Sequence, residues 1–309
     1  MQSLTHAYLV LNLVKGDGLN RKQENDLILG SIIPDISELG WGKEKHTHRS
    51  GWEFLKAHPK YPHFALGMIT HGESPQGLDY YTHRSVTGYL ARKKKKVLEI
   101  IHRYPECWAG LNEDAAMHKI IEFSVEILVG EKNKWLIRKV NNAFRSRYVR
   151  RPVQSFSKFS KVNPNLCYAL DNEHLQGWFK SFKNTPTAAA LWLNLISWRK
   201  LKDLPTDSFW NKLRLYLRFS YFYALNIMTP KQRYIRMFTE VKQYLRKDYL
   251  KFLDEVEKKL IKTKTEVYTY AQEHGKEDDS AKRSFQQFWH RSREKIRGRV
   301  ARLRHRQYR

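Results

Sequence analysis

Cysteine is scarce in this chain of 309 residues, which contains only Cys107 and Cys167. Two cysteines are too few for the disulfide framework of a small secreted domain, so a reducing compartment is the expected environment. Long apolar runs are also missing, because the most apolar window, residues 187–198, is short and is interrupted by Asn194. A membrane-spanning helix needs ~20 apolar residues. The first residues lack the cationic region and cleavage site of a signal peptide, so we expect a cytoplasmic protein without a transmembrane segment.

Acidic residues are in short supply, since 57 lysines and arginines stand against 31 aspartates and glutamates, a net charge of +26. Residues 1–130 are close to neutral, with 16 basic and 15 acidic side chains, whereas residues 131–309 contain 41 basic and 16 acidic ones. Such an asymmetry suits a polyanionic partner, either nucleic acid or an anionic membrane surface. A solvated basic face that serves only solubility is the alternative interpretation.

Strand-like alternation of apolar and polar residues is rare, and helical periodicity dominates. Apolar residues recur at helical spacing in residues 4–14, 24–33, 64–70 and 115–129, and Pro34 is expected to stop the second of these helices. Similar patterns continue through residues 178–273. The sequence therefore predicts an all-α fold.

Composition divides the chain into three parts: a near-neutral region (1–130), a basic, aromatic-rich helical region (131–273), and a linker with a basic tail (274–309). The tail predicts an amphipathic helix that suits phosphate backbones or a lipid interface. A tail helix that docks its apolar stripe on the body is equally consistent with this pattern. The apolar side chains that fall near one face of this helix are Phe285, Phe288, Trp289, Ile296, Val300 and Leu303.

Side chains that can bind metal gather in the near-neutral region. Asp79 and His83 are four residues apart, as are His118 and Glu122, so each pair lies on one face of a helix. Sets of imidazoles and carboxylates suit zinc or another divalent first-row metal, and the supply is large enough for more than one ion. Any one of these histidines alone would more often be a surface or core residue. The further candidates are His6, Asp35, His46, His48 and His71.

Taken in order, these residues resemble the zinc-dependent phospholipase C family. That family shares a mostly helical fold with the zinc-dependent single-strand nucleases and with the phospholipase D that cleaves glycosylphosphatidylinositol anchors. The resemblance covers about residues 1–130. The motifs that carry it are THAYL with His6, GSIIPDI with Asp35, THRS with His48, GMITH with His71, LDYYTH with Asp79 and His83, and MHKIIE with His118 and Glu122.

The resemblance implies a metal-dependent phosphodiesterase that binds two or three zinc ions. It implies that Asp35 also orients or deprotonates the attacking water. Two assignments stay open: the insert GESPQG delays Asp79, so Glu73 can replace it, and His46 competes with His48. In this reading one ion is held by Asp35, His48, His71 and Asp79, another by His83, His118 and Glu122, and Asp79 bridges to an ion near His6.

The substrate is a separate question, and the basic region leaves two answers open. A phospholipase would gain attraction to anionic lipid from polybasic segments and interfacial aromatic residues. A nuclease for single-stranded nucleic acid would gain affinity from counterion release and base stacking. In both cases the protein would be peripheral at its membrane or nucleic acid. A third alternative is a non-catalytic protein that binds nucleic acid or anionic membranes and whose metals are structural.

Overall fold

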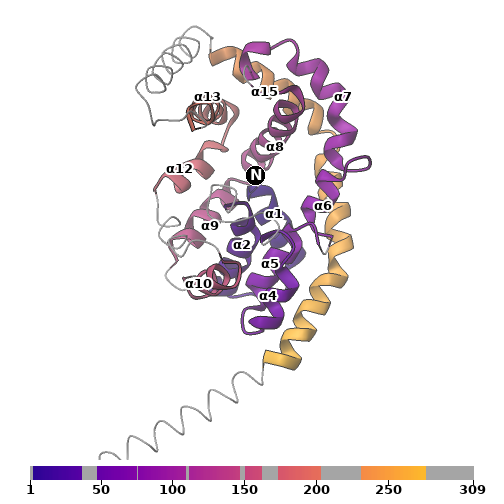
Figure 1. The fold of residues 1–309 in the computed structure, drawn as a ribbon, viewed down its shortest axis with the longest axis vertical. Coiled ribbons are helices and arrows are strands. Elements are labelled where there is room, and N and C mark those ends of the chain that lie inside the picture. Colours follow the sequence, from indigo (N-terminus) through magenta and orange to yellow (C-terminus); the bar gives the residue numbers. More distant parts are fainter. Residues whose placement is uncertain are drawn as a thin grey trace, which may run out of the picture.

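The computed structural model describes residues 3–36, 47–74, 76–108, 111–146, 150–161, 173–202 and 231–275. All regular elements in these ranges are helical, which confirms the all-α prediction (Figure 1). None of these helices is long and apolar enough to cross a membrane. In chain order the elements are α1 (Ser3–Leu13), α2 (Arg21–Ile36), α4 (Gly51–Ala57), α5 (Pro62–His71), α6 (Leu78–His83), α7 (Tyr89–Ile101), the 3-10 helix η2 (Pro105–Trp108), α8 (Glu113–Lys132), α9 (Lys134–Arg145), α10 (Arg150–Phe159), α12 (Glu173–Ser181), α13 (Thr185–Lys202), α15 (Lys231–Leu245) and a helix over residues 249–275.

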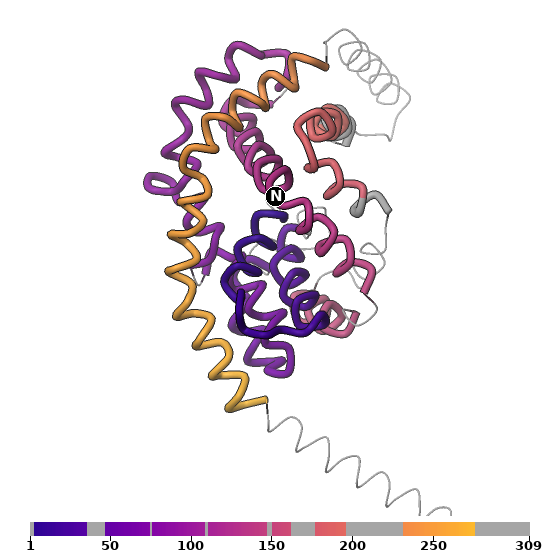
Figure 2. The backbone as a smooth tube through the Cα atoms, turned by 180° about the vertical axis from the view of Figure 1, so that it is seen from behind, coloured from indigo at the N-terminus to yellow at the C-terminus, as the bar shows by residue number. Residues whose placement is uncertain are grey.

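The centre of the fold is a group of three helices, α1, α2 and α5, which pack on one another (Figure 1). Their apolar residues, such as Leu4, Ile28 and Phe64, are fully buried, and burial of this kind is the main favourable term in folding. The long helix α8 packs against α1 on one side and against α7 and α15 on the other. The 249–275 helix runs along the outside of the molecule past α7 and α6 (Figure 2).

Helices α2 and α5 approach each other closely because glycine stands at both contact points. A Cβ atom on Gly30 would lie 2.0 Å from the carbonyl oxygen of Phe64, and one on Gly67 would lie 2.4 Å from that of Leu27. Neither position has room for a larger residue, since the atoms in the way belong to backbone. The close crossing brings together the C-terminal ends of the two helices, which carry Asp35 and His71.

The prediction that Pro34 stops the second helix is wrong, because α2 continues through it to Ile36. Proline lacks the N–H that would bond to the carbonyl of Gly30, four residues earlier. In the last turn of the helix this costs one hydrogen bond, which the packing of α2 against α1 and α5 outweighs. The consequence is that Asp35 is held on a helix and not on a loop.

The described part of the basic region packs on the near-neutral region through specific polar contacts. Lys139 lies 2.7 Å from Glu24, and Lys264 lies 3.1 Å from Asp17. The phenol of Tyr89 also donates a hydrogen bond of 3.0 Å to Asp248. The predicted tail helix, residues 281–309, and most of the linker before it lie outside the described residues.

Candidate metal centre

Eight histidine, aspartate and glutamate side chains from six segments meet at the centre of the fold. Only His83 and His118 among them are partly exposed, and the other six are buried. The contributing segments are α1 with His6, α2 with Asp35, the turn before α4 with His48, α5 with His71, α6 with Asp79 and His83, and α8 with His118 and Glu122.

Asp79 is the central member of this group because its two carboxylate oxygens face different histidines. Oδ2 lies 3.1 Å from Nε2 of His71 and 3.5 Å from Nε2 of His48. Oδ1 lies 3.3 Å from Nε2 of His6 and 3.8 Å from Nε2 of His83. One carboxylate therefore connects the inner and outer parts of the cluster.

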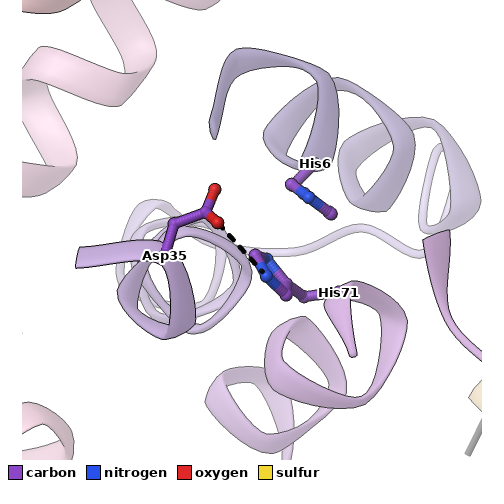
Figure 3. Close-up of side chains that lie close together, drawn as sticks. All are labelled: His6, Asp35 and His71. Carbon is purple, nitrogen blue, oxygen red and sulfur yellow. Dashed lines mark ion pairs between the residues drawn. The ribbon is translucent and has the colours of Figure 1, made fainter. Parts of the chain in front are cut away.

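The inner part is formed by His6, Asp35 and His71 (Figure 3). The rings of His6 and His71 stack with their centroids 3.7 Å apart, and Oδ1 of Asp35 lies 3.7 Å from Nε2 of His71. His48 approaches the same carboxylate oxygen to 3.9 Å. Two stacked imidazoles and a carboxylate thus share one buried site.

The outer part is formed by His83, His118 and Glu122. Oε1 of Glu122 lies 2.9 Å from Nε2 of His118 and 3.7 Å from Nε2 of His83. Lys119, one residue after His118, places its Nζ 2.9 Å from Oε2 of the same glutamate. The outer part therefore combines metal-capable atoms with a cation at its rim.

The spacing of these atoms fits divalent metal ions. Bonds of about 2.0–2.1 Å at a tetrahedral angle put neighbouring ligand atoms roughly 3.3 Å apart. In each of three groups the candidate ligand atoms all lie within 4.8 Å of one another: His6, Asp35 and His71; His48, His71 and Asp79; and His83, His118 and Glu122. The described residues could therefore hold one or more metal ions.

Several ring nitrogens of the cluster are buried without a hydrogen bond. Both nitrogens of His6 and Nε2 of His71 have no partner of acceptable geometry among the described residues. A buried polar atom of this kind is costly, and most such atoms in proteins have a partner. A bound cation would supply that partner, because a ring nitrogen without a proton can donate its lone pair to a metal.

The far sides of two histidines are fixed by hydrogen bonds. Nδ1 of His71 lies 2.7 Å from the carbonyl oxygen of Ser31, and Nδ1 of His48 lies 2.9 Å from Oγ1 of Thr47. Because a carbonyl can only accept, it requires the proton on Nδ1 of His71 and leaves Nε2 for the cluster. Partners of this kind orient histidine ligands in metal sites.

The insert between His71 and Asp79 forms a closed loop. The N–H of Gly77 donates to the carbonyl of Gly72 over 2.9 Å, so the chain returns to the end of α5 before α6 begins. Glu73 points to Arg49, whose Nη2 lies 2.7 Å from its carboxylate, and the structure places Asp79 rather than Glu73 beside the histidines. The competing His46 lies outside the described residues.

Glu126 is a member of the site's surroundings that the sequence analysis missed. Its buried carboxylate accepts hydrogen bonds of 2.9 Å from the backbone N–H groups of Leu4 and Thr5 and one of 2.8 Å from the Thr5 hydroxyl. These bonds anchor the first turn of α1 and thereby His6. Burial raises the pKa of Glu126 to about 7. The sequence does contain a pattern that could have identified Glu126, because His118, Glu122 and Glu126 form one i, i+4 series on α8.

The metal-free cluster is strongly coupled electrostatically. Burial alone would lower the pKa of His71, but the carboxylates of Asp79 and Asp35 raise it from 6.5 to about 9. Burial alone would raise the pKa of Asp79, but His71 and His6 hold it well below its usual range. At neutral pH the metal-free cluster therefore holds a buried ion pair between His71 and Asp79.

This coupling predicts that the metal-free protein becomes less stable between pH 7 and pH 9. A histidine whose pKa is raised on folding stabilises the fold below its unfolded value of 6.5, and that stabilisation is lost as the pH rises towards 9. The full shift corresponds to about 3 kcal/mol, of which about 2 kcal/mol is lost between pH 7 and pH 9. Urea unfolding of chelator-treated protein at the two pH values measures the loss. A His71→Gln variant should lack it, and a wild-type stability that is flat or rises over this interval would contradict the prediction.

Comparison with known proteins finds no match to this chain among family models, curated proteins or solved structures.

Proposed function

We propose that the chain is a metal-dependent phosphodiester hydrolase, similar over about residues 1–130 to the zinc-dependent phospholipase C family. The observation that carries this proposal is the convergence of eight metal-capable side chains into three groups, two of which share His71, with Asp79 between the inner and outer ones. Clusters of several ions suit phosphodiester chemistry, because the substrate concentrates negative charge on one phosphate.

The residues present fit zinc, at two or three positions. All donors are imidazole nitrogens and carboxylate oxygens, a set that suits zinc better than magnesium or calcium, which prefer oxygen alone. The inner ions would be held by His6, Asp35, His48, His71 and Asp79, and the outer ion by His83, His118 and Glu122. When bound, such ions neutralise phosphate oxygens and acidify water.

Asp35 is the residue we assign to the proton transfer. Its buried carboxylate lies within 4 Å of Nε2 of both His48 and His71, at the inner end of the cluster. A carboxylate in this position can orient the attacking water and accept its proton. Lys119, on the outer rim, adds a positive charge beside the outer group, 2.9 Å from Glu122. The basic region and its tail would contact the same polyanionic substrate or an anionic partner.

The proposal is tested by hydrolysis of bis(p-nitrophenyl) phosphate with the full chain. We expect hydrolysis with zinc, loss of hydrolysis on chelation, and recovery when zinc is returned. Asp35→Asn should slow the reaction by about 10²–10⁴-fold, the usual contribution of general base catalysis. Asp114→Asn, which removes an exposed carboxylate paired with Lys94, is the matched control and should retain the rate. Protein that binds zinc but does not cleave phosphodiesters would instead favour the alternative with structural metals.

A further inference from the structure

A pocket of about 220 Å³ lies next to the candidate metal centre, between α6, the start of α7 and the 249–275 helix. Helix α6 is common to both sites. Asp79 and His83 lie on the side of α6 that faces the cluster, whereas Tyr80 and Tyr81 line the pocket. Residues that are adjacent in a helix point in different directions, so a single short helix forms a wall of each site.

Three exposed cations line this pocket, and each lies over an aromatic ring. The guanidinium of Arg84 is 5.4 Å from the ring centre of Tyr80, and Nζ of Lys259 is 4.4 Å from that of Tyr81. The guanidinium of Arg92 is 5.9 Å from the ring centre of Phe252. Contacts with ring faces hold a cation in place while its N–H donors stay available for an anion.

None of these three cations forms an ion pair with a described residue, although Glu255 also lines the pocket. Three of the four neighbouring lysines of α7 behave differently. Lys94 lies 2.7 Å from Asp114, and Lys96 lies 2.7 Å from Glu99. Lys93 is paired with Asp248. The pocket therefore gathers cations whose charge the surrounding protein does not neutralise, and this is the chemistry of an anion site.

We infer that this pocket binds a second phosphate of the substrate, beside the phosphodiester that is cleaved, and that the substrate is a strand of nucleic acid. The inference deepens the proposed function and rests on it. The pocket is smaller than the roughly 300 Å³ lower bound for drug-sized ligands, so it suits one phosphate with its nearest substituents. Arginine and lysine donors supply the charge-assisted hydrogen bonds that a phosphate requires.

The surface around the pocket favours a strand over a lipid membrane. Residues 84–98 contain no acidic side chain, and Lys95, which forms no ion pair with a described residue, continues the line of unpaired cations about one helical turn beyond Arg92. A row of cations matches an extended chain of phosphates. A membrane surface requires apolar groups that enter the interface. The large apolar residues exposed in the described part of the chain are only three: Val86 in the turn between α6 and α7, Trp135 on α9 and Ile261 on the 249–275 helix.

The test is the salt dependence of binding to a short single-stranded phosphorothioate oligonucleotide, which resists cleavage. We expect Arg84→Gln combined with Lys259→Gln to weaken binding about tenfold or more at low salt. The slope of log K against log[salt] should fall by about 0.7 for each phosphate that the variant no longer neutralises. The conservative pair Arg84→Lys and Lys259→Arg should restore both the affinity and the salt dependence of the wild type. The control is Lys180→Gln with Lys183→Gln, which removes the same charge from α12 and the turn after it, on the opposite side of the molecule (Figures 1 and 2).

Equal losses of oligonucleotide affinity in the pocket variant and the control would overturn the inference, because they would show that binding depends only on the total charge of the protein. Unchanged oligonucleotide binding with weaker binding to vesicles of phosphatidylcholine and phosphatidylserine would overturn it in favour of a lipid headgroup. Metal content and hydrolysis of bis(p-nitrophenyl) phosphate are measured in parallel. If the chain cleaves this small substrate but the Arg84 and Lys259 variant binds the oligonucleotide as tightly as the wild type, this inference alone is contradicted. If the variant binds the oligonucleotide more weakly but the wild-type chain cleaves no phosphodiester, the proposed function alone is contradicted.

Discussion

Replacing Asp79 with asparagine is expected to remove most of the bound metal and the hydrolytic activity while leaving the helices in place. The carboxylate contacts His71, His48, His6 and His83, whereas an amide of the same size has one oxygen and no charge. Loss of residues that only orient ligands costs about 10–100-fold in affinity or activity, so loss of this residue should cost more than about 100-fold in each. Zinc titration and steady-state hydrolysis measure the two effects.

The matched control is Asp248→Asn, which replaces a half-buried carboxylate that pairs with Lys93 and the buried Tyr89 and is not one of the eight metal-capable side chains. Metal content and activity should be unaffected by that change. Circular dichroism should be unchanged in both variants, because neither substitution alters side-chain volume. If Asp79→Asn retained full metal content and activity, the central role of Asp79 would have to be abandoned.

Gly67→Ala is expected to lower the stability of the described fold substantially. Its Cβ would lie 2.4 Å from the Leu27 oxygen and 2.6 Å from the Ser31 nitrogen, so α5 would have to move away from α2. Overpacking of this kind costs up to about 3 kcal/mol, and backbone on the opposing side cannot yield as a side chain can. The same movement would separate His71 from Asp35 and weaken metal binding. Urea unfolding and zinc titration test the two consequences.

Gly177→Ala is the control for this prediction. Gly177 lies within α12, and no atom lies within 4 Å of the position that its Cβ would occupy. Alanine there should raise stability by about 0.5–1 kcal/mol, because glycine loses more backbone entropy in a helix. If both substitutions had the same small effect, the close crossing of α2 and α5 would not constrain the fold as described.

The sequence predicted the parts of the site that depend on local spacing. The pairs Asp79 with His83 and His118 with Glu122 follow directly from helical periodicity, and the all-α fold follows from the same pattern. Three features depended on tertiary contacts instead. The hydrogen bond from Gly77 to Gly72 returns Asp79 to His71 despite the insert, the carbonyl of Ser31 orients His71, and packing carries α2 through Pro34. No spacing in the sequence reveals these contacts.

Elemental analysis tests most directly whether this cluster holds metal ions. The full chain is purified without chelators and without a metal-binding tag, then compared with the Asp79→Asn variant. We expect two or three equivalents of zinc per chain, with a marked fall in the variant. A chain that binds no metal, even after zinc is supplied, would contradict the assignment of this cluster as a metal centre.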